Sequence, residues 1–93
     1  MLGELIMASV IVYSTNTCPY CDRAKELLTS KGAEFTEIKV DKNPDKMKEM
    51  LERSNGRRTV PQIFINGKHI GGFDDLKAIN DKGELDKLLS EGK

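Results

Sequence analysis

The sequence lacks an excess of charge of either sign, because fifteen Lys and Arg residues balance fifteen Asp and Glu residues. A dedicated nucleic-acid-binding protein usually carries a basic excess or a basic stripe, so we expect no nucleic-acid partner. No apolar run approaches the roughly 20 residues that span a bilayer, so no membrane span is predicted either. The charge balance still leaves room for a small anion held in a local pocket.

Only two cysteines are present, Cys18 and Cys21, and they lie three residues apart. One pair is too few for a disulfide scaffold, and it supplies only half of the four ligands of a typical structural zinc site. His69 is the only histidine, and we interpret it as a surface or hydrogen-bonded residue rather than a catalytic one. We therefore favour redox chemistry and predict no metal ligands, with a non-catalytic metal or cluster carrier as the competing hypothesis.

The 93 residues suffice for a single domain over 1–93, and no internal repeat divides it. Residues 1–8 are predicted to be an N-terminal extension, because Gly3 and Glu4 interrupt their apolar residues. A secretory signal needs a positive segment, a longer apolar core and a small-residue cleavage site, and these features are missing. We therefore expect a cytoplasmic protein whose cysteines are kept reduced by their surroundings.

Hydrophobic patterning predicts an α/β domain. The predicted elements, in chain order, are a buried strand over residues 9–14, a helix from Pro19, an alternating strand over residues 35–41, a helix from Asn43-Pro44-Asp45, a strand over residues 60–66, a return strand at His69-Ile70 and a final helix split at Gly83. Asn66-Gly67 is a strong hairpin signal between the last two strands. A strand–helix–strand start followed by a hairpin predicts a four-stranded mixed sheet with helices on both faces.

The motif Cys18-Pro19-Tyr20-Cys21 follows the buried strand and opens the first helix. Cys18 is expected at the helix N-terminus, where unpaired N–H groups and the helix dipole favour a thiolate. Cys21 lies one turn further on, closer to the core, and is expected to stay a thiol. Residues three apart share a helix face, so a disulfide between them can close. An exposed thiolate with a resolving partner is what thiol–disulfide exchange requires.

Two neighbouring segments before the third strand allow two interpretations each. Pro61, in Thr59-Val60-Pro61, is either an ordinary edge-strand proline or a cis proline. A cis bond would leave the backbone N–H and C=O of Val60 free to pair with an extended thiol peptide. Arg57-Arg58 is either a solvated loop end or a cluster that attracts an anionic thiol substrate.

A glycine pair and two acids, in Gly71-Gly72-Phe73-Asp74-Asp75, precede the next helix. The structural interpretation is a turn followed by a cap, in which the acids satisfy the start of the helix. The functional interpretation adds a site in which backbone N–H groups hold a carboxylate and an Asp carboxylate accepts from an ammonium. An α-amino acid end carries both of these groups.

Together these motifs make the chain resemble the glutaredoxin family over about residues 9–89, in order and in spacing. The resemblance implies a thioredoxin fold, a cis Pro61 and glutathione as the reductant, with no bound cofactor. It also implies a glutathione site made by the following residues: Tyr20, Arg57, Arg58, Thr59, Val60, Pro61, Gly72, Phe73, Asp74 and Asp75. The implied activity is the reduction of glutathionylated proteins and protein disulfides by a monomer, through Cys18 and Cys21.

The chain departs from the family pattern at two positions. Thr15 stands where the family usually has lysine, and Phe73 stands where it often has a further cysteine. Two related classes match less well. Glutaredoxin-like proteins reduced by thioredoxin reductase usually lack the Pro-Tyr pair, and iron–sulfur carriers usually have a single cysteine followed by glycine, where this chain has Pro19.

Overall fold

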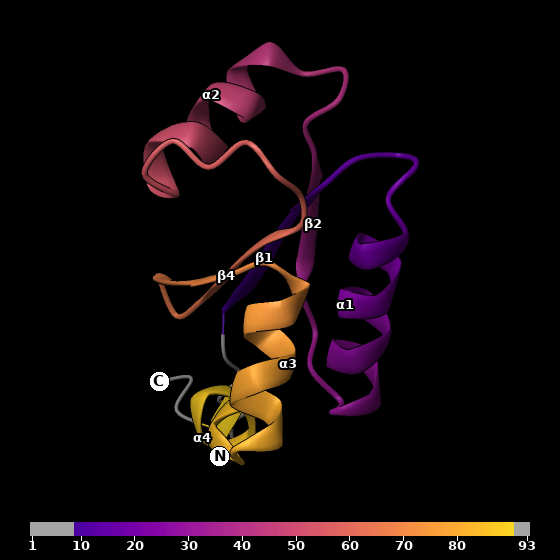
Figure 1. Ribbon diagram of the computed structural model, residues 1–93, viewed down its shortest axis with the longest axis vertical. Coiled ribbons are helices and arrows are strands. Elements are labelled where there is room, and N and C mark those ends of the chain that lie inside the picture. Colours follow the sequence, from indigo (N-terminus) through magenta and orange to yellow (C-terminus); the bar gives the residue numbers. More distant parts are fainter. Residues whose placement is uncertain (1–8, 91–93) are drawn as a thin grey trace, which may run out of the picture.

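The computed structural model describes residues 9–90, so the expected extension over residues 1–8 lies outside the described residues. The elements, in chain order, are β1 (Val10–Ser14), α1 (Pro19–Ser30), β2 (Thr36–Lys39), α2 (Pro44–Arg53), β3 (Gln62–Ile65), β4 (Lys68–Gly71), α3 (Phe73–Asp81) and α4 (Glu84–Ser90) (Figure 1). This order confirms the predicted one, including the split of the final helix. Within residues 9–90, no helix has the length and apolar composition that crossing a membrane requires.

The four strands form one mixed sheet in the order β2-β1-β3-β4. β1 is parallel to β2 and antiparallel to β3, and β3 is antiparallel to β4. The turn between β3 and β4 has positive φ angles at Asn66 (53°) and Gly67 (81°), as a two-residue hairpin turn of this type requires. β3 begins at Gln62, two residues later than predicted, because Pro61 has no N–H for the ladder.

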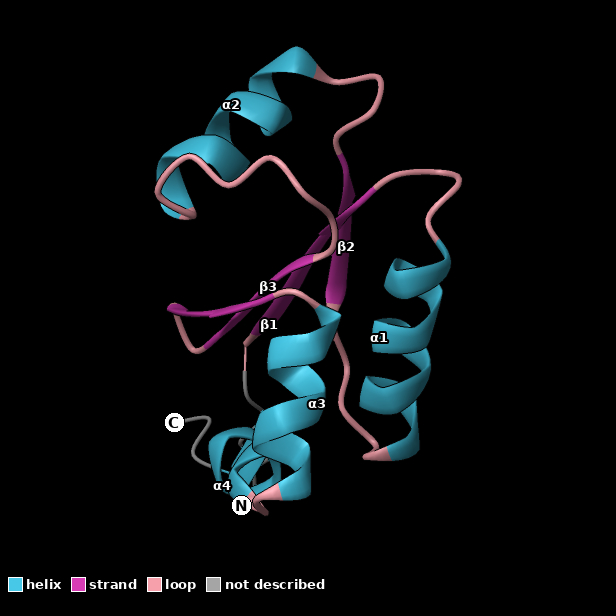
Figure 2. Cartoon of the chain, in the orientation of Figure 1, coloured by secondary structure: helices cyan, strands magenta, loops and turns pink. Residues whose placement is uncertain are grey.

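Helices cover both faces of the sheet, as the sequence predicts (Figure 2). On one face, β1 and β3 pack against α1, α3 and α4, and the buried side chains there are Val10, Val12, Ala24, Leu28, Ile63, Ile65, Leu76 and Leu85. On the other face they pack against α2, with Tyr13, Val40, Met50 and Phe64 buried. The alternation along β3 therefore sends neighbouring side chains into two separate cores.

Three segments that are distant in the sequence meet at one end of the sheet: the start of α1, the loop before β3 and the start of α3. Cys18 is the N-cap of α1, and Pro19 is its first residue. Asn43 caps α2 through a side-chain oxygen that accepts from the amide of Lys46, at 3.3 Å. Gly72 begins α3 directly after β4. The start of α1, the loop before β3 and the start of α3 surround the candidate site.

Candidate active site

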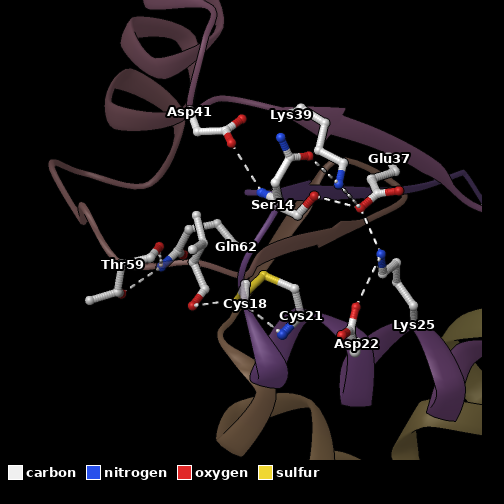
Figure 3. Close-up of a disulfide and its surroundings, with 12 residues drawn as sticks. Ser14, Cys18, Cys21, Asp22, Lys25, Glu37, Lys39, Asp41, Thr59 and Gln62 are labelled. Atoms are coloured by element: carbon white, nitrogen blue, oxygen red, sulfur yellow. Dashed lines mark hydrogen bonds and ion pairs between the residues drawn. A yellow bond between two sulfur atoms is a disulfide. The ribbon is translucent and has the colours of Figure 1, made fainter.

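Cys18 and Cys21 are joined by a disulfide, and their Cα atoms lie 5.1 Å apart (Figure 3). The prediction that one helical turn lets this pair close is therefore confirmed. The structure shows the oxidised form of the pair. The N-cap and the first turn of α1 hold the two sulfurs.

The two sulfurs have different surroundings. Cys21 is 1% exposed and Cys18 is 8% exposed, so Cys18 is more covered than the sequence predicts, although it is the more accessible of the two. The amide N of Cys21 points at the Cys18 Sγ, at 3.1 Å. Once the disulfide is reduced, this N–H and the positive end of α1 favour negative charge on Cys18 rather than on Cys21. The asymmetry suits Cys18 to attack and Cys21 to resolve.

The peptide bond between Val60 and Pro61 is cis, which settles the open alternative at this proline. The carbonyl oxygen of Val60 lies 3.8 Å from the Cys18 Sγ. In the disulfide this sulfur carries no proton, so the pair is in contact without a hydrogen bond. A backbone segment with polar groups therefore borders the reactive sulfur.

An open cleft of about 420 Å³ is lined in part by Val60, whose carbonyl oxygen contacts the Cys18 Sγ. Its lining comes from the start of α1, the loop before β3 and the start of α3, and consists of Tyr20, Arg57, Thr59, Val60, Pro61, Gly72, Phe73, Asp74 and Asp75. The structure thus brings together all of the predicted glutathione-contacting residues except Arg58. Arg58 is exposed and does not line the cleft.

Asp75 is already engaged at the mouth of the cleft. Its Oδ2 accepts from the backbone N of Gly72 at 3.0 Å and lies 3.7 Å from Nη1 of Arg57. Asp75 therefore caps α3, as the structural interpretation of the sequence proposes. A Cβ at Gly71, where φ is +121°, would overlap the Asp75 carboxylate, so this approach requires glycine. Asp74 is exposed and has no hydrogen bond or ion pair to other residues of 9–90.

The remaining wall of the cleft is aromatic. Tyr20 is 56% exposed and stacks on Phe73 with the ring centroids 6.3 Å apart. The guanidinium carbon of Arg23 lies 5.6 Å from the centre of the Tyr20 ring. The cleft therefore offers an apolar surface, backbone polar groups and charges of both signs to one small molecule.

A group of charged side chains on the other side of the disulfide was not predicted from the sequence. The Glu37 Oε2 accepts from Ser14 Oγ at 2.6 Å and from Lys25 Nζ at 2.8 Å (Figure 3). The hydrogen bond from Lys25 and then that from Ser14 lower the pKa of Glu37, and the bond to Glu37 raises the pKa of Lys25. The alternating pattern of β2 predicted that Glu37 points away from its apolar neighbours, but sequence spacing alone gives no signal for a cluster drawn from three elements.

A mixed sheet with a cysteine pair joined by a disulfide at a helix N-terminus, next to a cis proline, places the chain among the thiol–disulfide oxidoreductases of thioredoxin fold. Comparison with known proteins narrows this class. The glutaredoxin family model matches residues 10–70. Glutaredoxin 3 of Escherichia coli (strain K12) is 58% identical over 83 residues, which cover 89% of this chain and 99% of that protein. A glutaredoxin of Pseudomonas aeruginosa is 51% identical over 84 residues, 90% of this chain and 99% of its own length. The chain belongs to the glutaredoxin family.

Solved structures agree with this assignment. The solution structure of a glutaredoxin from Brucella melitensis has a TM-score of 0.82 at 55% identity and covers 98% of both chains. The crystal structure of the buckwheat glutaredoxin–glutathione complex has a TM-score of 0.81 at 37% identity, over 90% of this chain and 78% of that one. The predicted thioredoxin fold is confirmed. The protein is a glutathione-dependent thiol–disulfide oxidoreductase, with glutathione as its reductant.

Proposed function

We propose that this protein reduces both glutathionylated proteins and protein disulfides, with Cys18 as the nucleophile and Cys21 as the resolving thiol. The unequal surroundings of the two sulfurs support these roles, because Cys18 contacts the Val60 carbonyl and receives the N–H of Cys21, whereas Cys21 is the more deeply buried of the two. We further propose that it acts as a monomeric single domain in the reducing cytoplasm, where glutathione can regenerate it.

With a glutathionylated protein, the Cys18 thiolate attacks the glutathione sulfur and the protein leaves as its thiolate. A second glutathione thiolate then attacks the new mixed disulfide. This step releases oxidised glutathione and restores Cys18. The net reaction consumes two electrons from glutathione and frees one protein thiol.

With a protein disulfide, Cys18 attacks one sulfur and the other leaves as a thiolate. Cys21 then loses its proton and attacks Cys18, which frees the second protein thiol and closes the Cys18–Cys21 disulfide. This product is the form that the structure contains. Two glutathione molecules reduce it in turn.

The cleft beside Cys18 is the observation that carries the assignment of a glutathione site. Glutathione has a carboxylate at each end, one amino group and an extended backbone. The cleft supplies Arg57 for a carboxylate, Asp74 and Asp75 for an ammonium, and the backbone of Val60 for strand-like pairing. A buckwheat relative solved with glutathione supports the same ligand for this cleft.

Arg57 and Arg58 give a matched test, because adjacent cations differ in whether they line the cleft. Replacing Arg57 with Ala should raise the KM for glutathione about three- to fivefold, as expected for one exposed charge contact. Replacing Arg58 with Ala should leave it unchanged. The measurement is reduction of a glutathionylated substrate coupled to glutathione reductase. A KM for glutathione that is the same in all three proteins would contradict the proposed site.

A further inference from the structure

A chain of hydrogen-bonded side chains runs from His69 in β4, through the buried Gln62, to the exposed Thr59 in the loop before β3. The His69 Nε2 lies 2.7 Å from Gln62 Oε1. The Gln62 Nε2 lies 2.9 Å from the carbonyl oxygen of Thr59 and 3.2 Å from its Oγ1. Gln62 is 0% exposed, so a loss of these partners would leave buried polar atoms unpaired. None of these three contacts includes a cysteine.

The direction of every hydrogen bond in this chain is fixed by its last member. A backbone carbonyl only accepts, so the Thr59 oxygen requires the amide nitrogen of Gln62 as its donor. The remaining amide atom of Gln62 is then the oxygen, which also only accepts. His69 must therefore donate from Nε2, and in the neutral ring Nδ1 carries no proton.

The surroundings of His69 favour a neutral ring, which fits this single-donor arrangement. Burial, and then the nearby Arg57 guanidinium, lower the pKa of His69, while Asp75 opposes them. The ring also stacks on Phe64, with centroids 4.8 Å apart. His69 therefore has two contacts that can be removed separately, a donated hydrogen bond and a ring stack.

We propose that His69 is a positioning residue that acts through Gln62 to hold Thr59, and with it the Val60 backbone, in the geometry that binds glutathione. Thr59 and Val60 both line the cleft, and the Val60 carbonyl borders Cys18. The side chain of Gln62 is hydrogen-bonded to Thr59 at one end and to His69 at the other. This inference rests on the proposed glutathione site.

Two substitutions of His69 separate positioning from packing. His69→Phe keeps a ring for Phe64 but removes the donor, and it should raise the KM for glutathione about three- to fivefold with little change in kcat. His69→Gln removes the ring but keeps an amide donor at a similar reach, and its KM should stay near that of the parent protein. The opposite pattern, with a raised KM in the Gln variant alone, would show that ring packing matters and would overturn the proposal. Equal values in the two variants would overturn it as well.

A double-mutant cycle tests the route through Gln62. Gln62→Met removes both ends of the chain at similar side-chain length, and its KM for glutathione should match that of His69→Phe. The double variant should be no worse than either single variant, because both break the same path. Additive effects would overturn the proposal, and thermal melts confirm that each variant is folded.

The Arg57→Ala protein distinguishes failure of this inference from failure of the proposed site. If Arg57→Ala raises the KM for glutathione and His69→Phe does not, the cleft binds glutathione and only the positioning role is wrong. If neither variant changes the KM, the cleft is not the glutathione site and the inference fails with it.

Discussion

The disulfide separates two regions that hold the same kinds of charged side chain under different conditions. In the cleft, Arg57 and Asp75 lie 3.7 Å apart, and their side chains are 46% and 51% exposed. On the opposite side, Lys25 and Glu37 lie 2.8 Å apart, and only 23% and 26% of their side chains is exposed. A hydrogen bond from Ser14, which is fully buried, completes the second group.

This difference in exposure and pairing indicates which charged side chains are available to bind a ligand. A loosely paired, exposed ion pair contributes at most about 1 kcal/mol, so a ligand can exchange its partners at little cost. A half-buried carboxylate that accepts two short hydrogen bonds is different. Breaking those bonds costs more free energy than a contact with a ligand would restore. We therefore expect loss of the exposed cleft charges that cap no helix, Arg57 and Asp74, to change binding. Substitutions around Glu37, and of the helix cap Asp75, should change stability.

The largest expected effect concerns the two cysteines, which lie between these regions. Cys18→Ser should abolish all activity, because the nucleophile at the helix N-terminus is lost. Cys21→Ser should keep the reduction of glutathione mixed disulfides but lose most of the reduction of protein disulfides. Parallel assays with a glutathionylated substrate and a protein disulfide measure the two activities. If Cys21→Ser lost both activities and Cys18→Ser lost neither, the assigned roles would be reversed.

Within the cleft, substitutions of Asp74 and Asp75 should have different effects, because Asp75 caps α3 and Asp74 is available to a ligand. Asp75→Ala should lower the free energy of unfolding by about 1 kcal/mol, because the Gly72 amide loses its acceptor. Asp74→Ala should leave the melting temperature unchanged but raise the KM for glutathione, if its carboxylate receives the glutamyl ammonium. Thermal melts run beside glutathione titrations make the comparison. An unchanged glutathione dependence in Asp74→Ala would remove that residue from the site.

On the opposite side of the disulfide, Glu37→Gln should lower the free energy of unfolding by about 1 kcal/mol at neutral pH, with activity retained. The pKa of Glu37 is lowered in the folded protein from its ordinary value of 4.5, chiefly by the hydrogen bond from Lys25. Its contribution to stability is therefore present above pH 4.5 and is lost as the pH falls through the folded pKa.

Denaturation at a series of pH values tests this contribution. The Glu37→Gln protein should show a smaller loss of stability on acidification below pH 4.5 than the parent protein. Glu26→Gln is the matched control, because Glu26 is exposed on α1 and has no ion pair to other residues of 9–90. A Glu37 variant with the acid profile of the parent would show that the group is not a stabilising one.

Local signals in the sequence predicted most of the fold. The apolar run of β1, the prolines that begin α1 and α2, and the Asn66-Gly67 turn each act within a few residues of the chain. Most of the residues that line the cleft were predicted from three motifs, and the fold brings the segments that carry these motifs together. Arg58 shows the limit of that argument, because an adjacent pair of cations gives no sign of which one turns towards the cleft.

Two groups of hydrogen-bonded polar side chains were not predicted, for a physical reason. The Glu37 group joins β1, α1 and β2, and the His69–Gln62–Thr59 chain joins β4 to the loop before β3. Each bond depends on strand register and on side-chain rotamers, which periodicity does not encode. The sequence supported only the expectation that His69 is a surface or hydrogen-bonded residue, and the structure shows the hydrogen-bonded alternative.

The smallest expected effect comes from Thr15, between β1 and α1, where the family usually has lysine. Thr15 does not line the cleft, and the amide of the adjacent Asn16 donates to Asp41 at 3.1 Å. A lysine there would add one solvent-exposed charge near Cys18, worth about 0.5–1 kcal/mol per contact. Thr15→Lys should therefore tighten glutathione binding about two- to fivefold and shift the thiolate titration of Cys18 to lower pH.

Salt dependence decides whether this gain is electrostatic. Screening weakens exposed charges, so the tighter glutathione binding of Thr15→Lys should shrink at high salt. Thiolate absorbance against pH and glutathione kinetics at low and high salt are the measurements. No change in either quantity at low salt would show that Thr15 is not a lost contact. Arg57, which already lines the cleft, would then be the cation that pairs with the glutathione carboxylate. The cleft would in that case need no lysine at position 15 to bind this carboxylate.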